Sequence, residues 1–291
     1  EKNVVIEEIR DSLDTPQDVA NDAFMEQMFP DHPYGYPILG TEQTVGSFTR
    51  DHIRKFISDN YNTYRISIIA AGAVDHQKVV DTVRKRMEDH INSTRTRREI
   101  TPHDPQKKKL IITRDITQCH FITGRRSLGY TDARRTTYSI LNSVLSAGMT
   151  SRLFQNIRER YGFAYTIYSF IDAFKTTGLF GVYVATDLKH VDTLNELIWK
   201  EFNTLKKDGL SETELDKVKA QTKGSLVMST ESMHHRLERM AQQHIRYNEI
   251  TSIDESLKKI DAVTTAHIKE LSEYLFDESQ FHTLLLKPNK G

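Results

Sequence analysis

Hydrophobic residues recur at the spacing of an amphipathic α-helix over much of the chain. At its start, Val4, Val5, Ile9 and Leu13 lie on one helical face. Pro16 then indicates a break, followed by a second helix. The clearest stripe has five apolar positions on one face of a later helix: Val191, Leu194, Ile198, Phe202 and Leu205.

Shorter runs of β-branched and aromatic residues predict strands. They lie at 65–75, 109–115, 118–127, 164–174, 178–187 and 281–288. The run 65–75 is interpreted as a buried strand that ends at Gly72. From residue 109 onward, pairs of strands alternate with pairs of helices, the helix 150–162 among them. This order predicts an α+β fold, in which neighbouring strands pair antiparallel and helices cover one face.

Polar residues at the predicted helix starts support these boundaries. Thr49 and Asp75 precede helical segments and can cap them. Ser211 and Glu214 have the spacing of a capping box, in which each side chain bonds the backbone of the other. Residues 30–40 carry prolines and glycines and are predicted to form a loop.

A polar, basic segment predicts the domain organisation. Residues 92–109 lack an apolar period and contain two prolines, so we predict a linker there. Residues 1–91 would be the C-terminal part of a first domain, because they resemble the end of the second module without its beginning. Residues 110–291 would form the complete second domain. Each would be a two-layer module of sheet and helices, with the first module incomplete.

Composition narrows the classes of partner. Lys plus Arg and Asp plus Glu both number 40, so the formal net charge is zero. This balance gives no support for nucleic acid or an anionic membrane as the main partner. No apolar run approaches the roughly 18 residues of a membrane helix. The single cysteine, Cys119, excludes an internal disulfide and is interpreted as a buried strand thiol.

Two pairs of residues are candidates for chemistry. Glu1 and Glu8 are seven positions apart, so both carboxylates can share a helix face and serve a cation, or form an ordinary charged surface. Arg158 lies on the last turn of a predicted helix, and Tyr165 lies at the start of the next strand. These two could bind a substrate or simply pack. The sequence has no H-E-x-x-H, no H-x-x-E-H and no cysteine pair, so it holds no complete zinc site.

The histidines do not fill this gap. His234 and His235 are adjacent, whereas two ligands on one helix face need a spacing of four residues. His32 lies in the proline-rich loop, where a hydrogen bond that orders the loop is the expected role. The sequence alone therefore predicts no metal bound by histidine.

Three segments nevertheless resemble a known family. "EKNVVIEEI", "HPYGYPILG" and "LSAGMTSRLFQNIRERYGFAY" are similar to segments of the pitrilysin and insulysin (inverzincin) metallopeptidases. The similarity is greatest to the branch of the mitochondrial processing peptidase and its bacterial relatives, and it extends over essentially the whole chain. It implies the LuxS/processing-peptidase-like metallopeptidase fold.

The resemblance also implies roles for the candidate residues. Glu8 matches the family's third zinc ligand, and Glu1 matches a glutamate beside the metal site. Arg158 and Tyr165 match an Arg and a Tyr that hold substrate near the scissile bond. The H-x-x-E-H helix would precede residue 1. We therefore expect zinc in an intact parent, but none bound to this chain, which alone should be inactive.

These matches predict a function and partners. The parent would be a zinc metalloendopeptidase that cleaves peptides or unfolded polypeptides. The alternative is a non-catalytic, peptidase-like partner or structural subunit. The resemblance further implies a homodimer, or else a heterodimer with a related subunit. A soluble protein is expected, cytoplasmic or periplasmic if bacterial.

Overall fold

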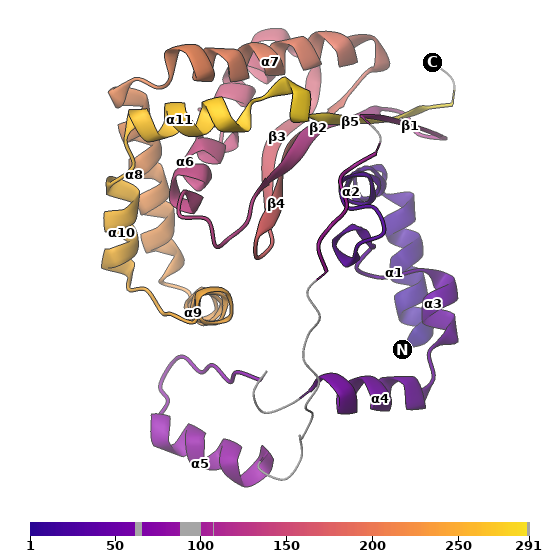
Figure 1. Ribbon diagram of the computed structural model, residues 1–291, viewed down its shortest axis with the longest axis vertical. Helices are drawn as coiled ribbons and strands as arrows, with labels where there is room; N and C mark the ends of the chain where they lie inside the picture. Colours follow the sequence, from indigo (N-terminus) through magenta and orange to yellow (C-terminus); the bar gives the residue numbers. More distant parts are fainter. Residues whose placement is uncertain (62–65, 88–99, 107, 290–291) are drawn as a thin grey trace. The chain divides into compact units, whose positions relative to one another are not determined.

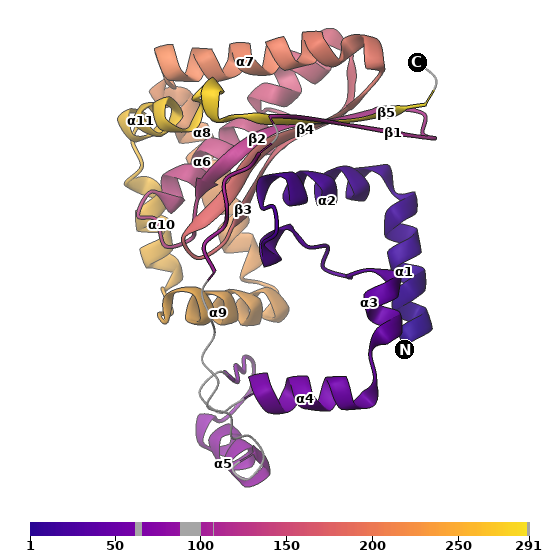
Figure 2. The same cartoon turned by 45° about the vertical axis from the view of Figure 1, so that its right-hand side comes forward.

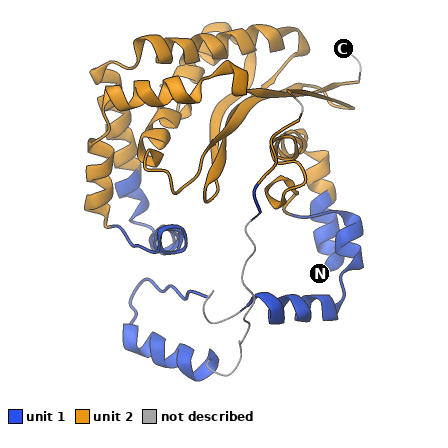
Figure 3. Cartoon of the chain, in the orientation of Figure 1, with its two compact units in different colours: residues 1–9, 39–101, 226–251 blue, residues 10–38, 102–225, 252–291 orange. Residues whose placement is uncertain are grey.

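The computed structural model describes residues 1–61, 66–87, 100–106 and 108–289. These residues divide into two compact units (Figure 3). Unit 1 comprises residues 1–9, 39–101 and 226–251. Unit 2 comprises residues 10–38, 102–225 and 252–291. Of the predicted linker 92–109, residues 92–99 and 107 lie outside the described part.

Unit 2 is built on a five-stranded sheet with the order β1-β5-β2-β4-β3 (Figure 1). Its strands are β1 (Lys109–Arg114), β2 (Cys119–Leu128), β3 (Ala164–Ala173), β4 (Thr177–Thr186) and β5 (His282–Pro288). The predicted α+β class is confirmed. The predicted antiparallel pairing of the first two strands is wrong, because β5 inserts between them and runs parallel to β1. The C-terminal strand brings the fully buried Leu284 and Leu286 to this position.

One face of this sheet is covered by helices that the apolar period predicted (Figure 2). They are α6 (Arg135–Ser146), α7 (Val191–Asp208) and α11 (Thr265–Leu275). All five residues of the predicted α7 stripe are buried. At the centre of this layer the rings of Phe202 and Phe276 stack at 4.2 Å, with Phe180 of β4 beside them. Aromatic burial on this scale makes the layer a principal source of stability.

Helix α2 (Pro16–Met28) covers the opposite face of the sheet. Phe24 packs against Gly124 of β2, where a Cβ atom would lie 3.1 Å from the Phe24 ring. Arg126 of β2 donates from Nε to the carbonyl oxygen of Met28 at 2.7 Å, which satisfies the last carbonyl of α2. The sequence-based division assigns residues 10–38 to the first domain. The structure groups them with unit 2, because α2 buries its apolar side chains against the sheet of that unit.

Seven further α-helices complete the described part of the chain. They are α1 (Lys2–Asp14), α3 (Glu42–Ser47), α4 (Arg50–Asn60), α5 (His76–Met87), α8 (Glu212–Ser229), α9 (Met233–Tyr247) and α10 (Ile253–Asp261). The Thr49 hydroxyl accepts from the backbone of His52, and Asp75 accepts from the backbone of Lys78, so both predicted caps are confirmed. Within the described ranges, no helix is long and apolar enough to cross a membrane.

The strand predicted at 65–75 is wrong for its described part. Residues 66–71 of unit 1 form no strand, and Ile68 is 49% exposed. A strand is stabilised by hydrogen bonds to a neighbour, and no described segment pairs with this one. The β-branched residues of this segment favour an extended strand, but among the described residues no neighbouring strand is present to pair with it.

Candidate functional site

Arg158 lies on an irregular helical turn. The predicted helix at 150–162 is confirmed, but its centre is a π-helical turn, η2 (Phe154–Glu159). Such wide turns occur frequently at functional sites. The helix ends at Gly162, whose φ of 66° suits glycine and whose amide donates to the carbonyl of Arg158 at 2.9 Å. The Arg158 side chain is exposed, with its guanidinium carbon 5.0 Å from the centre of the Phe154 ring.

Tyr165 lies at a second irregularity, a shift in strand register. Ala164 pairs with Thr186 and Thr166 pairs with Ala185, so Tyr165 is the extra residue of a β-bulge. Its side chain is 65% exposed. The alternative that Tyr165 simply packs is therefore excluded, because the side chain is exposed.

The connection between the two residues is short and is fixed by a buried side chain. Thr186 is fully buried, and its hydroxyl donates to the carbonyl oxygen of Phe163 at 2.6 Å. The Phe163 ring stacks on His190 at 4.0 Å. Within the described part of the chain, neither the Arg158 guanidinium nor the Tyr165 hydroxyl has a recorded hydrogen-bond partner. Both can therefore donate to an external acceptor, such as a peptide carbonyl.

Glu1 and Glu8 belong to unit 1, and both side chains are exposed. Glu8 lies on α1, and Glu1 immediately precedes it, with its carbonyl accepting from the amide of Val5 at 3.1 Å. Among the described residues, no group of three or more His, Cys, Asp or Glu side chains could hold a metal ion. The donors present thus do not fit a catalytic zinc, which takes three protein ligands. The roles of Glu1 and Glu8 stay predictions.

The other sequence candidates have structural roles. His32 is buried, and its Nδ1 accepts from the amide of Tyr34 at 3.1 Å, which confirms the predicted loop-ordering bond. Cys119 is a fully buried strand thiol, as predicted, and burial raises its pKa. The His234 imidazole lies 3.5 Å from Glu238 on the exposed face of α9.

Sequence reasoning missed a buried polar pair beneath α2. The His120 imidazole lies 2.6 Å from the Tyr183 hydroxyl, and both residues are buried in the sheet. Burial lowers the pKa of His120, because the protonated ring loses its hydration. The alternation of strand 118–127 could have placed His120 on an inner face, but nothing in the sequence indicated its partner.

The predicted capping box at the start of α8 is only half formed. The Ser211 hydroxyl accepts from the Glu214 amide at 3.2 Å, as predicted. The predicted reciprocal bond, from the Ser211 amide to the Glu214 carboxylate, is wrong. Both Glu214 carboxylate oxygens instead accept from Arg152, at 2.7 and 2.8 Å. A bidentate, charge-assisted pair is stronger than a bond to a backbone amide, which explains the exchange of partners.

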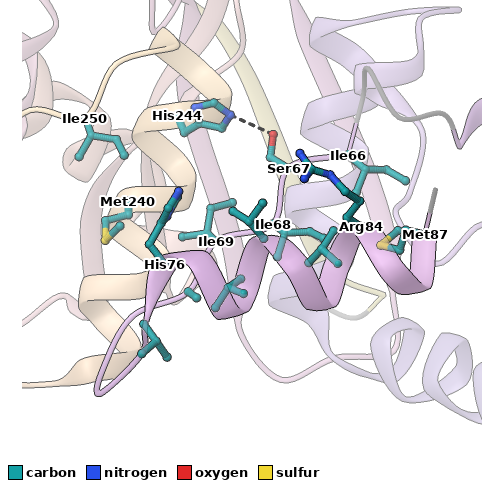
Figure 4. Close-up of a pocket in the computed structure, with 15 residues that line it drawn as sticks. Ile66, Ser67, Ile68, Ile69, His76, Arg84, Met87, Met240, His244 and Ile250 are labelled. Carbon is teal, nitrogen blue, oxygen red and sulfur yellow. Dashed lines mark hydrogen bonds between the residues drawn. The ribbon is translucent and has the colours of Figure 1, made fainter.

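Unit 1 contains a cavity of about 790 Å³ with largely apolar walls (Figure 4). Residues 66–70 and helix α5 supply most of the lining, and the rest comes from Val74, Ile250, and Met240 and His244 of α9. The Ser67 hydroxyl lies 2.9 Å from Nε2 of His244. Within the described residues no carboxylate is recorded against this histidine, so the pair lacks the group that orients the base in a catalytic triad.

Comparison with known proteins settles the family. A family model described as "Peptidase M16 inactive domain" matches residues 47–222. The chain belongs to the M16 peptidase family. It is 32% identical to an uncharacterised zinc protease, YmxG, of Bacillus subtilis, over 99% of this chain and 70% of the relative. An uncharacterised zinc protease of Streptomyces coelicolor is 33% identical, over 94% and 61%. The M16 chain thus spans 61% to 70% of the length of these two relatives.

Solved structures share the M16 fold. A peptidase M16 inactive domain from Pseudomonas fluorescens superimposes with a TM-score of 0.88 at 18% identity, over 99% of this chain and 69% of that one. A protease from Helicobacter pylori gives 0.87 at 20% identity, over 99% and 71%. A chain of complex III2 from Candida albicans gives 0.85 at 18% identity, over 98% and 70%. The fold expected from the resemblance is confirmed.

Proposed function

We propose that this chain is the substrate-holding part of an M16 zinc metalloendopeptidase. Arg158 and Tyr165 would bind the backbone of an extended peptide, and the zinc histidines would lie on an H-x-x-E-H segment outside this sequence. Glu8 would be the remaining zinc ligand, with Glu1 beside the metal site. The observation that carries the proposal is the exposure of two donors that have no hydrogen-bond partner among the described residues, each on its own backbone irregularity.

The chemistry of the two donors fits peptide hydrolysis. A guanidinium and a phenol both donate hydrogen bonds, and a peptide carbonyl oxygen accepts them. A donor fixed near a scissile carbonyl stabilises the negative charge that develops on its oxygen. Because Arg158 and Tyr165 both act as hydrogen-bond donors, they are suited to bind the carbonyl oxygen of the substrate.

Peptide binding by the chain tests this proposal directly. We expect a fluorescein-labelled, extended peptide to bind with a Kd that Arg158→Gln raises by about tenfold, the usual effect of losing one charged hydrogen bond. Arg160→Gln is the matched control, because Arg160 is an exposed arginine of the same segment. Equal effects of the two variants would show a non-specific charge effect and contradict the proposed site.

The second candidate is a non-catalytic, peptidase-like subunit. The likeness in fold to a chain of complex III2 supports it, as does the description of the matched family domain as inactive. A cleavage assay on the longer parent, with and without a zinc chelator, separates the candidates. Zinc-dependent cleavage supports the peptidase, and peptide binding without cleavage supports the subunit.

We further propose that the parent forms a homodimer, with a heterodimer of related subunits as the alternative. Apolar side chains exposed on unit 1, including Ile53, Phe56 and Ile57 of α4, supply surface that association could bury. Analytical ultracentrifugation of the parent at micromolar concentration tests this assembly. A fully active monomer would contradict it.

A further inference from the structure

Three arginines lie close together on the segment that carries Arg158, and the structure treats one of them differently. Arg158 and Arg160 are exposed, and each has an aromatic ring of its own segment as its recorded neighbour. The Arg152 side chain is only 16% exposed and points toward two other helices. The sequence gives no means of telling the three apart.

Arg152 joins this segment to both neighbouring helices of unit 2. Its Nε and one terminal nitrogen donate to the two carboxylate oxygens of Glu214 on α8, at 2.7 and 2.8 Å. Its other terminal nitrogen lies 3.9 Å from Glu201 on α7, whose side chain is 12% exposed. An arginine fork held by a carboxylate in two bonds is fixed in direction as well as in distance.

Arg152 lies immediately before the π-helical turn η2. The turn begins at Phe154, two residues after Arg152, and the Phe154 ring lies against the Arg158 guanidinium. A π-helical turn has wider hydrogen bonding than an α-helix and is rare, so it needs support from its surroundings. Leu153 and Ile157 supply apolar support from the buried side, and Arg152 supplies the directional part.

We propose that Arg152 is a positioning residue that fixes the π-helical turn and, through it, the direction of Arg158. Arg152 itself does not touch substrate. The expected effect of Arg152 on peptide binding rests on the proposed function, because it acts through Arg158. The structural content of the proposal can be measured independently.

Amide hydrogen exchange measures that structural content. We expect Arg152→Met to raise the exchange rates of amides 155–162 at least tenfold while those of β4 and α7 stay within twofold. Because Glu214 would be left without its cation, the double variant Arg152→Met/Glu214→Met is the second test. It removes the pair together and should fold, with the same local increase. Arg160→Met is the control and should leave exchange unchanged.

Two exchange results would overturn the proposal. One is exchange of amides 155–162 within twofold of the wild type in the double variant. The other is an equal rise across the whole of unit 2, which a general structural role would produce.

A double-variant cycle in peptide binding separates this proposal from the proposed function. Arg152→Met should raise the Kd about tenfold in the wild-type background and less than twofold in the Arg158→Gln background, because its effect passes through Arg158. Additive effects would overturn the positioning role. If Arg158→Gln alone leaves the Kd unchanged, the proposed function fails, and the exchange measurement still decides the role of Arg152.

Discussion

Replacing Tyr165 by phenylalanine separates catalysis from stability in this fold. The phenol is 65% exposed, and its hydroxyl has no recorded partner within the described chain. Loss of that hydroxyl should therefore change the free energy of unfolding by less than about 0.5 kcal/mol. Tyr36→Phe is the matched control, because Tyr36 is 60% exposed and also belongs to unit 2.

The effect on cleavage should be much larger. If the hydroxyl donates to the developing oxyanion, its loss removes one preorganised donor, which costs about 100-fold in kcat, or about 2.7 kcal/mol. KM should change less, because the bond strengthens only in the transition state. The assay is steady-state cleavage of a fluorogenic peptide by the full-length enzyme that we propose. Equal kcat for Tyr165→Phe and the wild type would refute this reasoning.

Three further predictions concern packing, pH and metal. Phe202→Ala should lower the free energy of unfolding by about 3–5 kcal/mol, because the Phe202 ring is fully buried and stacked on Phe276. Trp199 packs against Phe202, so its fluorescence during denaturation measures the change. The pKa of His120 is lowered in the folded state, so near and below the ordinary histidine pKa of about 6.5 the unfolded chain binds more protons than the folded chain. Stability should therefore fall from pH 7 to pH 5. Thermal melts at each pH should show a flatter slope for His120→Gln than for the wild type. The chain alone should bind no zinc below about micromolar concentration and cleave no peptide, because Glu8 supplies one ligand where three are needed. Submicromolar binding in calorimetry, lost in Glu8→Gln, would show a ligand set that we have missed.

The regular spacing of apolar residues was enough to predict most of the helices and strands. The α7 stripe was predicted residue by residue, because a helix that buries one face must repeat apolar side chains every three or four positions. The caps at Thr49 and Asp75 were predictable because their bonds are local. The parallel β1–β5 pair was not, because it joins residues 109–114 to residues 282–288, and no local pattern encodes a partner so distant in the chain.

The candidate site shows the same limit more sharply. The identities of Arg158 and Tyr165 came from a resemblance, whereas the backbone that presents them came from the structure. A period of 3.6 or 2.0 assumes uniform geometry, so it cannot anticipate a π-helical turn or a bulge. Glu214 gives a parallel case, because a local capping rule was overridden by Arg152, which is distant in sequence.

The bulge also explains how a polar residue can occupy this position in the strand. Ile167 and Ser169 are buried on the face of β3 that packs against α6, where the Ser169 hydroxyl lies 3.4 Å from the carbonyl of Asn142. Simple alternation would place Tyr165 on that same face and bury its hydroxyl. A buried hydroxyl without a partner costs about 1–3 kcal/mol. The extra residue breaks the alternation at one end of the strand and leaves the packed register beyond it intact. An exposed phenol and a well-packed strand are thus compatible in the same short segment, which a regular strand would not allow.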